Sequence, residues 1–196
     1  MTWLAVIPLK GTGERKTRLA GRLDKERRRL LSRQMFDHVA AVLGESVAIS
    51  EIALLSDLHP PEWQERFFPD EGRGLNAELA SLASSIGPRP LLVIHADLPL
   101  LTKEDISLLL AEGDEGCAIA PDRKGSGTNA LAFRDPSSFE FLFGPESCGR
   151  HLAASGGRMR VIRRLGLGLD VDTPEDLDAA MALGFSPHWG PVISWG

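Results

Sequence analysis

Short apolar runs alternate with longer amphipathic segments along most of the chain. A short apolar run bounded by turn residues is typical of a strand buried on both faces, whereas apolar residues three and four apart are typical of a helix. We expect strands at residues 3–9, 47–56, 91–94, 116–121, 128–133, 159–164 and 169–172. We expect helices at residues 24–43, 75–85, 103–111 and 147–154 and a last one after Thr173, with only a short amphipathic turn at 62–68.

This alternation predicts an α/β fold with a mostly parallel sheet and helices on both faces. The 196 residues suffice for one medium-sized domain, which we place at residues 1–184. Residues 185–196 carry Trp189 and Trp195 without periodicity and form a tail that packs on the body or on a partner chain. The sequence leaves open whether the protein is a homodimer.

Charge and composition narrow the class of partner. The formal net charge of −5 excludes the global basic field of a nucleic-acid binder. Basic residues nevertheless crowd between Lys10 and Arg29, which favours an anionic small ligand. No apolar run approaches the ~20 residues of a membrane span, and we expect a cytoplasmic protein. Cys117 and Cys148 match neither a zinc spacing nor a disulfide framework.

Three acids are candidate metal ligands. Asp97 follows the apolar run 91–94, and the carboxyl ends of buried strands are where open α/β sheets bind ligands. Asp170 and Asp172 are two apart in an expected strand, so their carboxylates point to one side and repel unless a cation intervenes. Together the three would form an oxygen cluster suited to Mg²⁺. The alternatives are that Asp97 caps a turn and that Asp170 or Asp172 caps the following helix.

Three glycine-bearing segments could bind phosphate. Gly11 and Gly13 lie in a basic loop where backbone amides can approach an anion, although a solvated turn is the competing interpretation. Thr128 follows a Gly-Ser-Gly turn, and Ser147 follows Gly144 at an expected helix start. Singly, such segments are more often turns than sites. The histidines His95 and His151 suggest no role.

Taken in order, the short motifs of this chain resemble the 2-phospho-L-lactate guanylyltransferase family of coenzyme F420 biosynthesis, which includes phosphoenolpyruvate guanylyltransferases. The resemblance extends to about residue 183. It is carried by residues 8–10 (PLK), 16–19 (KTRL), 74–76 (GLN), 96–99 (ADLP), 120–122 (APD), 127–131 (GTNAL), 143–147 (FGPES) and 169–177 (LDVDTPEDL).

The resemblance implies a three-layer, Rossmann-like fold of the nucleotide-diphospho-sugar-transferase type. It implies an enzyme that joins GMP from GTP to a small phosphorylated acid and releases pyrophosphate, with Mg²⁺ as cofactor. The acceptor would be 2-phospho-L-lactate, phosphoenolpyruvate or phosphoglycerate, with no nucleic acid or membrane partner.

The resemblance also implies roles for particular residues. Those binding the nucleotide would be Leu9, Lys10, Gly11, Lys16 and Asn76, the last at the guanine. Lys16 and Asp97 would be catalytic, and the metal ligands would be Asp97, Asp170 and Asp172. The acceptor phosphate would be held by Thr128, Gly144 and Ser147.

One departure from the family pattern leaves alternatives open. Thr12 and Arg15 make the first loop more similar to that of molybdenum-cofactor guanylyltransferases, which use a pterin acceptor. A non-catalytic nucleotide-binding regulator is the alternative from another functional class.

Overall fold

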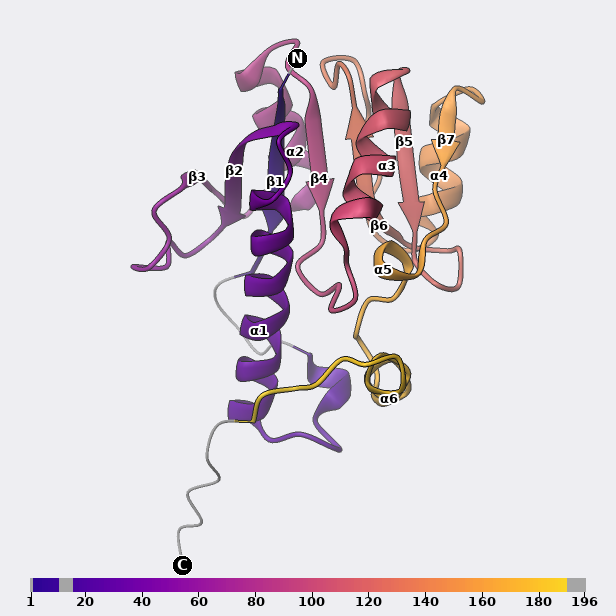
Figure 1. Cartoon of the computed structure of the whole chain (residues 1–196). Coiled ribbons are helices and arrows are strands. Elements are labelled where there is room, and N and C mark those ends of the chain that lie inside the picture. Colours follow the sequence, from indigo (N-terminus) through magenta and orange to yellow (C-terminus); the bar gives the residue numbers. More distant parts are fainter. Residues whose placement is uncertain (1, 11–15, 190–196) are drawn as a thin grey trace, which may run out of the picture.

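The computed structural model describes residues 2–10 and 16–189. Its seven-stranded sheet has the order β3-β2-β1-β4-β6-β5-β7 (Figure 1). The strands are β1 (Trp3–Pro8), β2 (Ile49–Ser56), β3 (Arg66–Pro69), β4 (Leu91–Ile94), β5 (Cys117–Pro121), β6 (Thr128–Phe133) and β7 (Met159–Val161). The helices are α1 (Lys25–Gly44), α2 (Leu75–Ile86), α3 (Lys103–Asp114), α4 (Ser147–Ala154), α5 (Leu165–Gly168) and α6 (Pro174–Ala182), with a 3₁₀ turn η1 (Thr17–Leu19).

Helices cover both faces of the sheet, as the apolar runs predict (Figure 1). Alternate residues of β1 point to opposite faces: Ala5 and Ile7 pack with residues of α1 and α3, whereas Leu4 and Val6 pack with residues of α2. All four side chains are fully buried. Burial on both faces explains why this strand reads as a continuous apolar run rather than an alternating one.

Strand β6 is antiparallel to its neighbours β4 and β5, whereas the other pairs in the sheet are parallel. Ile94 at the end of β4 lies opposite Ala130, and the His95 N–H donates to the Asn129 carbonyl at 2.9 Å. The beginning of β6 therefore lies at the sheet edge where β1, β2 and β4 end.

Side-chain caps start α1, α3 and α6 at the expected residues. The Asp24 carboxylate accepts a main-chain N–H at the start of α1. Thr102 and Asp105 form a capping box at α3, and Thr173 and Asp176 form another at α6. These three helices therefore begin at the residues that the capping signals in the sequence predict.

Two expected elements are wrong. Residues 169–172 do not form a strand but follow α5 as an extended segment outside the sheet. Leu169 and Val171 alternate with acids because they are buried with residues of α1 and α6, which produces a strand-like period without a sheet partner. Residues 66–69, expected within a turn, form edge strand β3 beside β2. Its half-exposed residues and Pro69 conceal the apolar run that marks the central strands.

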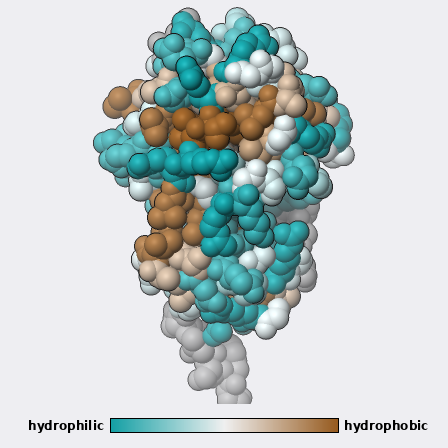
Figure 2. Space-filling view, turned by 90° about the vertical axis from the view of Figure 1, so that its right-hand side faces the viewer, coloured by the Kyte–Doolittle hydropathy of each residue, from teal (hydrophilic) through white to brown (hydrophobic). Residues whose placement is uncertain are grey.

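The opposite edge of the sheet is β7, a strand of only three residues. Val161 and Leu165 are exposed near this edge, and Arg160 and Arg163 are exposed beside them. Figure 2 views this side of the molecule and shows apolar patches separated by hydrophilic side chains. A short edge strand with cationic neighbours resists pairing with another sheet.

Part of the expected tail packs on the body. Gln34 of α1 donates to the Ser186 carbonyl at 2.9 Å and accepts the His188 N–H at 2.8 Å. The guanidinium of Arg27 lies over the Trp189 ring. Trp195 and the rest of residues 190–196 lie outside the described residues. Among the helices that the structure describes, none is long and apolar enough to cross a membrane.

Candidate functional site

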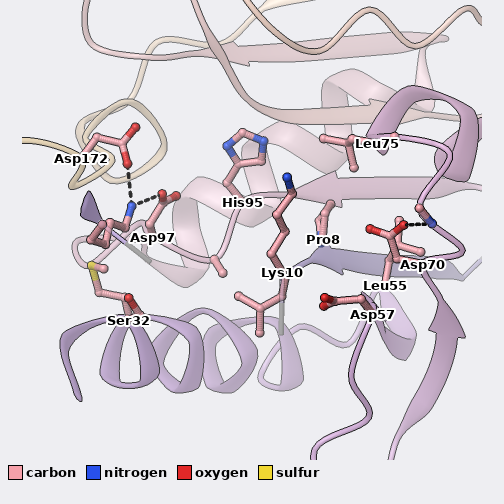
Figure 3. Close-up of a pocket in the computed structure, with 16 residues that line it drawn as sticks. Pro8, Lys10, Ser32, Leu55, Asp57, Asp70, Leu75, His95, Asp97 and Asp172 are labelled. Carbon is pink, nitrogen blue, oxygen red and sulfur yellow. Dashed lines mark hydrogen bonds and ion pairs between the residues drawn. The ribbon is translucent and has the colours of Figure 1, made fainter. Parts of the chain in front are cut away.

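A cavity of about 740 Å³ opens at the carboxyl ends of the central strands (Figure 3). Pro8 ends β1 and Leu9 follows it, Leu55 comes from β2, and His95 and Asp97 follow β4; all of them line the cavity. Strand β1 has β2 on one side and β4 on the other, so the direction of winding reverses at this point. Open α/β sheets bind their ligands in the crevice at such a reversal.

Three carboxylates lie together beside this cavity, and two of them, Asp97 and Asp172, line it. Asp97, Asp170 and Asp172 each offer an oxygen within 4.8 Å of the others. The segment that carries Asp170 and Asp172 is held to the Asp97 loop by the Val171 N–H, which donates to the Asp97 carbonyl at 3.1 Å. The grouping predicted from the sequence is therefore present, although a loop rather than a strand produces it.

The Lys16 ammonium lies between two of these carboxylates. Its Nζ is 2.5 Å from Asp97 Oδ2 and 2.7 Å from Asp172 Oδ1 (Figure 3). Burial disfavours the charged ammonium, but the two carboxylates outweigh it and raise the pKa of Lys16. Burial likewise opposes ionisation of Asp97, yet the Lys16 charge lowers the pKa of that carboxyl. Both groups are therefore charged at neutral pH.

The cluster remains short of positive charge. Burial and the nearby Asp97 carboxylate raise the pKa of Asp170, whose side-chain partner is the uncharged amide of Asn129. The buried Asp97 Oδ1 has no hydrogen-bond partner in the described part of the chain. An unpaired buried carboxylate oxygen is costly. A hard divalent cation such as Mg²⁺, which prefers oxygen ligands, fits this set of donors.

The predicted nucleotide-binding residues fall into three groups. Leu9, Lys10 and Lys16 line the cavity. Gly11 lies outside the described residues. Asn76 uses its amide elsewhere: Nδ2 donates to the Phe143 carbonyl at 3.1 Å, and Oδ1 accepts the Phe143 N–H at 2.7 Å. Its predicted contact with guanine is untested, and its observed contact is with the loop that precedes Gly144.

The three residues predicted to hold an acceptor phosphate lie next to one another. The hydroxyls of Thr128 and Ser147 are 3.0 Å apart, and both residues are 2% exposed. Gly144 adopts a φ of 121°, a conformation that favours glycine, and its carbonyl accepts the Ser147 N–H at 3.2 Å. The structure thus brings two hydroxyls together at the start of α4, but these residues do not line the cavity described above, and ligand binding by them stays a prediction.

Two histidines to which the sequence assigns no role belong to this region. His95 lines the cavity, and its ring centroid is 5.6 Å from that of Phe143. His151 is fully buried, its Nδ1 lies 3.1 Å from Thr128 Oγ1, and burial lowers its pKa to about 4. The sequence signal that could have indicated a role for His151 is its spacing, because it lies four residues after Ser147 and so shares the same face of the helix.

Comparison with known sequences identifies relatives over nearly the whole chain. The model of the family described as "Guanylyl transferase CofC like" matches residues 3–188. A phosphoenolpyruvate guanylyltransferase of Sphaerobacter thermophilus is 38% identical, with 91% of this chain and 92% of the relative covered. One of the same name from Rubrobacter xylanophilus is 37% identical, with 94% and 96% covered.

Solved structures share the fold at low sequence identity. A nucleotidyl transferase from Methanothermobacter superposes with a TM-score of 0.67 at 14% identity, covering 93% of this chain and 97% of that one. A CMP:2-keto-3-deoxy-manno-octonic acid synthetase complexed with CTP gives a TM-score of 0.60 at 16% identity, covering 93% and 98%. These likenesses establish a nucleotidyltransferase-like α/β fold.

Proposed function

The chain belongs to the CofC-like guanylyltransferase family, and from that premise we propose that it joins GMP from GTP to phosphoenolpyruvate with release of pyrophosphate. It is a nucleotidyltransferase whose guanylyl transfer serves coenzyme F420 biosynthesis. The names of the relatives support phosphoenolpyruvate over 2-phospho-L-lactate and phosphoglycerate as the acceptor. The observation that carries the proposal is the acidic cluster with Lys16 at the cavity that follows β1 and β4.

In the proposed reaction a phosphate oxygen of the acceptor attacks the α-phosphorus of GTP in line. The new bond joins that oxygen to the α-phosphorus, and the bond to the β-phosphate bridging oxygen breaks, so pyrophosphate leaves with the electron pair. The acceptor phosphate is already ionised near neutral pH. No side chain therefore has to remove a proton, and we assign no role as a base to His95, which lines the cavity.

Asp97, Asp170 and Asp172 would hold Mg²⁺. When bound, the ion neutralises charge on the phosphate oxygens and orients the leaving group. Lys16 would bind the phosphates of GTP and stabilise the negative charge that builds on pyrophosphate. Leu9 and Lys10 would contact the nucleotide from the end of β1.

Thr128, Gly144 and Ser147 would hold the acceptor phosphate. Hydroxyls and main-chain amides can bind a phosphate by hydrogen bonds without adding a full positive charge, so its oxygens stay nucleophilic. The main-chain hydrogen bond from the His95 N–H to the carbonyl of Asn129, the residue after Thr128, supports this assignment, because it brings the start of β6 to the segment that carries Asp97. The acceptor would then face the α-phosphate across the metal cluster.

The experiment is an acceptor screen with the purified protein, GTP and Mg²⁺, in which released pyrophosphate is measured. Phosphoenolpyruvate, 2-phospho-L-lactate, 3-phosphoglycerate and molybdopterin are offered separately, and we expect the highest kcat/KM with phosphoenolpyruvate. Reaction with molybdopterin alone would indicate the pterin branch, and GTP binding without any pyrophosphate would indicate a regulator. Asp97→Asn should abolish turnover, whereas the matched control Asp178→Asn removes an exposed carboxylate bonded to Arg22 and should not.

A further inference from the structure

A buried chain of hydrogen bonds runs from the main chain through His151 to the two hydroxyls. The Leu142 N–H donates to His151 Nε2 at 2.8 Å. His151 Nδ1 is 3.1 Å from Thr128 Oγ1, which is 3.0 Å from Ser147 Oγ. His151 is 0% exposed, and each hydroxyl residue is 2% exposed. His151 is therefore closed to solvent, and a ligand can reach this series of hydrogen bonds only at Thr128 or Ser147.

The first contact fixes the tautomer of the imidazole. A main-chain N–H can only donate, so His151 Nε2 must be the unprotonated nitrogen that accepts it. The proton of the neutral ring then resides on Nδ1, which consequently donates to Thr128 Oγ1. Burial lowers the pKa of His151 to about 4, which keeps the ring neutral at physiological pH.

Counting hydrogens shows what this leaves for a ligand. His151 Nδ1, Thr128 and Ser147 carry one polar hydrogen each, and the two contacts between them use two of the three. The His151 hydrogen is used in the first contact, so the one left over belongs to a hydroxyl. Neither hydroxyl has another hydrogen-bond partner within the described structure. This series of hydrogen bonds therefore leaves one hydroxyl hydrogen free to donate to a ligand.

Packing holds the imidazole at this position. Its ring centroid lies 5.1 Å from that of Phe143 and 5.7 Å from that of Phe139. Phe143 also contacts His95, which lines the cavity, and it immediately precedes Gly144. The histidine is thus fixed between the core and the acceptor side of the site without reaching the cavity itself.

We propose that His151 is a positioning residue that orients the Thr128 and Ser147 hydroxyls so that one of them donates to the phosphate of the acceptor. This inference rests on the proposed function, because it takes Thr128 and Ser147 as the acceptor-binding pair. His151 touches neither substrate and acts through Thr128. Without the Nδ1 hydrogen the two hydroxyls would still keep one free hydrogen, but Thr128 Oγ1 would lose the donor that fixes its orientation, so that hydrogen would no longer be held toward the anion.

Two conservative variants separate the two hydrogen bonds of the ring. The amide nitrogen of asparagine is bonded to Cγ, as Nδ1 of histidine is. His151→Asn can therefore still donate to Thr128 but cannot reach the Leu142 N–H. The amide of glutamine lies one bond further, at the distance of Nε2, so His151→Gln can accept the Leu142 N–H but cannot donate to Thr128. Both variants leave a void among Phe139 and Phe143 and should lower Tm.

The assay measures kcat and KM for phosphoenolpyruvate at saturating GTP. We expect His151→Gln to raise the KM for phosphoenolpyruvate about 10-fold, the effect of one net hydrogen bond, with the KM for GTP unchanged. His151→Asn should stay within about threefold of wild type, since its donor remains. In the His151→Gln/Thr128→Val double variant, KM should be no higher than in Thr128→Val alone, because both changes break the same path.

The matched control is His38, whose Nε2 lies 2.9 Å from the Leu101 carbonyl, away from the acceptor residues. His38→Gln should lower Tm without changing the KM for phosphoenolpyruvate. Equal KM values for the asparagine and glutamine variants at position 151 would show that His151 serves packing alone. Additive effects of His151→Gln and Thr128→Val on this KM would show the same. If the wild-type protein releases no pyrophosphate with phosphoenolpyruvate, the proposed function fails first and the inference fails with it.

Discussion

Replacing Lys16 with methionine is expected to let the three carboxylates bind a divalent cation in the absence of nucleotide. In the structure the Lys16 ammonium bonds to Asp97 and Asp172, two of the candidate metal ligands. A cation that approaches the cluster must therefore displace Lys16 before it can use those oxygens. Methionine keeps an unbranched side chain of similar length and removes the charge.

The magnitude follows from the two contacts. A hydrogen bond to a charged group contributes about 1.5–3 kcal/mol. The Asp172 side chain is 45% exposed, so water screens its contact with Lys16 and we discount that contact entirely. Displacement from Asp97, whose side chain is 21% exposed, then costs about 1.5–3 kcal/mol, which corresponds to roughly 10- to 100-fold in the Kd of the cation.

The assay titrates Mn²⁺ into the nucleotide-free protein and measures free Mn²⁺ by electron paramagnetic resonance. Lys16→Met should lower the Kd for Mn²⁺ by the factor above, and added Mn²⁺ should raise the Tm of the variant more than that of wild type. Lys10→Met is the control, since Lys10 lines the same cavity but is not bonded to these carboxylates in the described structure. An unchanged Kd in Lys16→Met, or an equal gain in Lys10→Met, would refute the reasoning.

Three further predictions concern activity and stability. Asp172→Asn should lower turnover at least ~100-fold with the fold retained, because metal-supplied charge stabilisation contributes several kcal/mol; a near-wild-type rate with a normal melting curve would remove Asp172 from the site. Asn76→Ala should lower the free energy of unfolding by about 1–3 kcal/mol, since it leaves the Phe143 N–H and C=O without their partner, and an unchanged urea midpoint would contradict this. The lowered pKa of His151 means that the unfolded chain binds a proton that the folded protein excludes, so stability should fall as pH decreases from about 6.5 to about 4. The loss attributable to this residue is at most about 3 kcal/mol, and a stability–pH curve of His151→Gln that is no flatter than that of wild type would rule it out.

Local signals in the sequence predict the central strands and the helix starts well. Buried runs such as 91–94 and caps such as Asp24 and Thr173 depend on residues within one or two turns of each other. The predictions for edge strand β3 and for residues 169–172 were wrong because the structure of both depends on residues that are distant in sequence. Leu169 and Val171 pack on α1, more than 120 residues earlier in the chain, and no local period records that contact.

In the candidate site, too, some features can be predicted from the sequence and others depend on contacts between residues that are distant in the chain. Motif resemblance brings together Asp97, Asp170 and Asp172, and the structure places their oxygens within 4.8 Å. What the sequence does not contain is the hydrogen-bond partner of each polar group. The pairing of Asn76 with Phe143 spans 67 residues, and the role proposed for His151 depends on its contact with Thr128, 23 residues away in sequence.

The reversed direction of β6 has a consequence for how such a protein can diverge. Residues proposed to bind GTP follow β1 and β4, whereas residues proposed to bind the acceptor come from the start of β6 and from α4, on the other half of the sheet. Each substrate would therefore have its own half, and the halves meet at Asp97 and at Phe143, which contacts both Asn76 and His95. Substitutions around Thr128 and Ser147 can change the choice of acceptor while the nucleotide half is inherited unaltered, so new specificities can arise without rebuilding the chemistry.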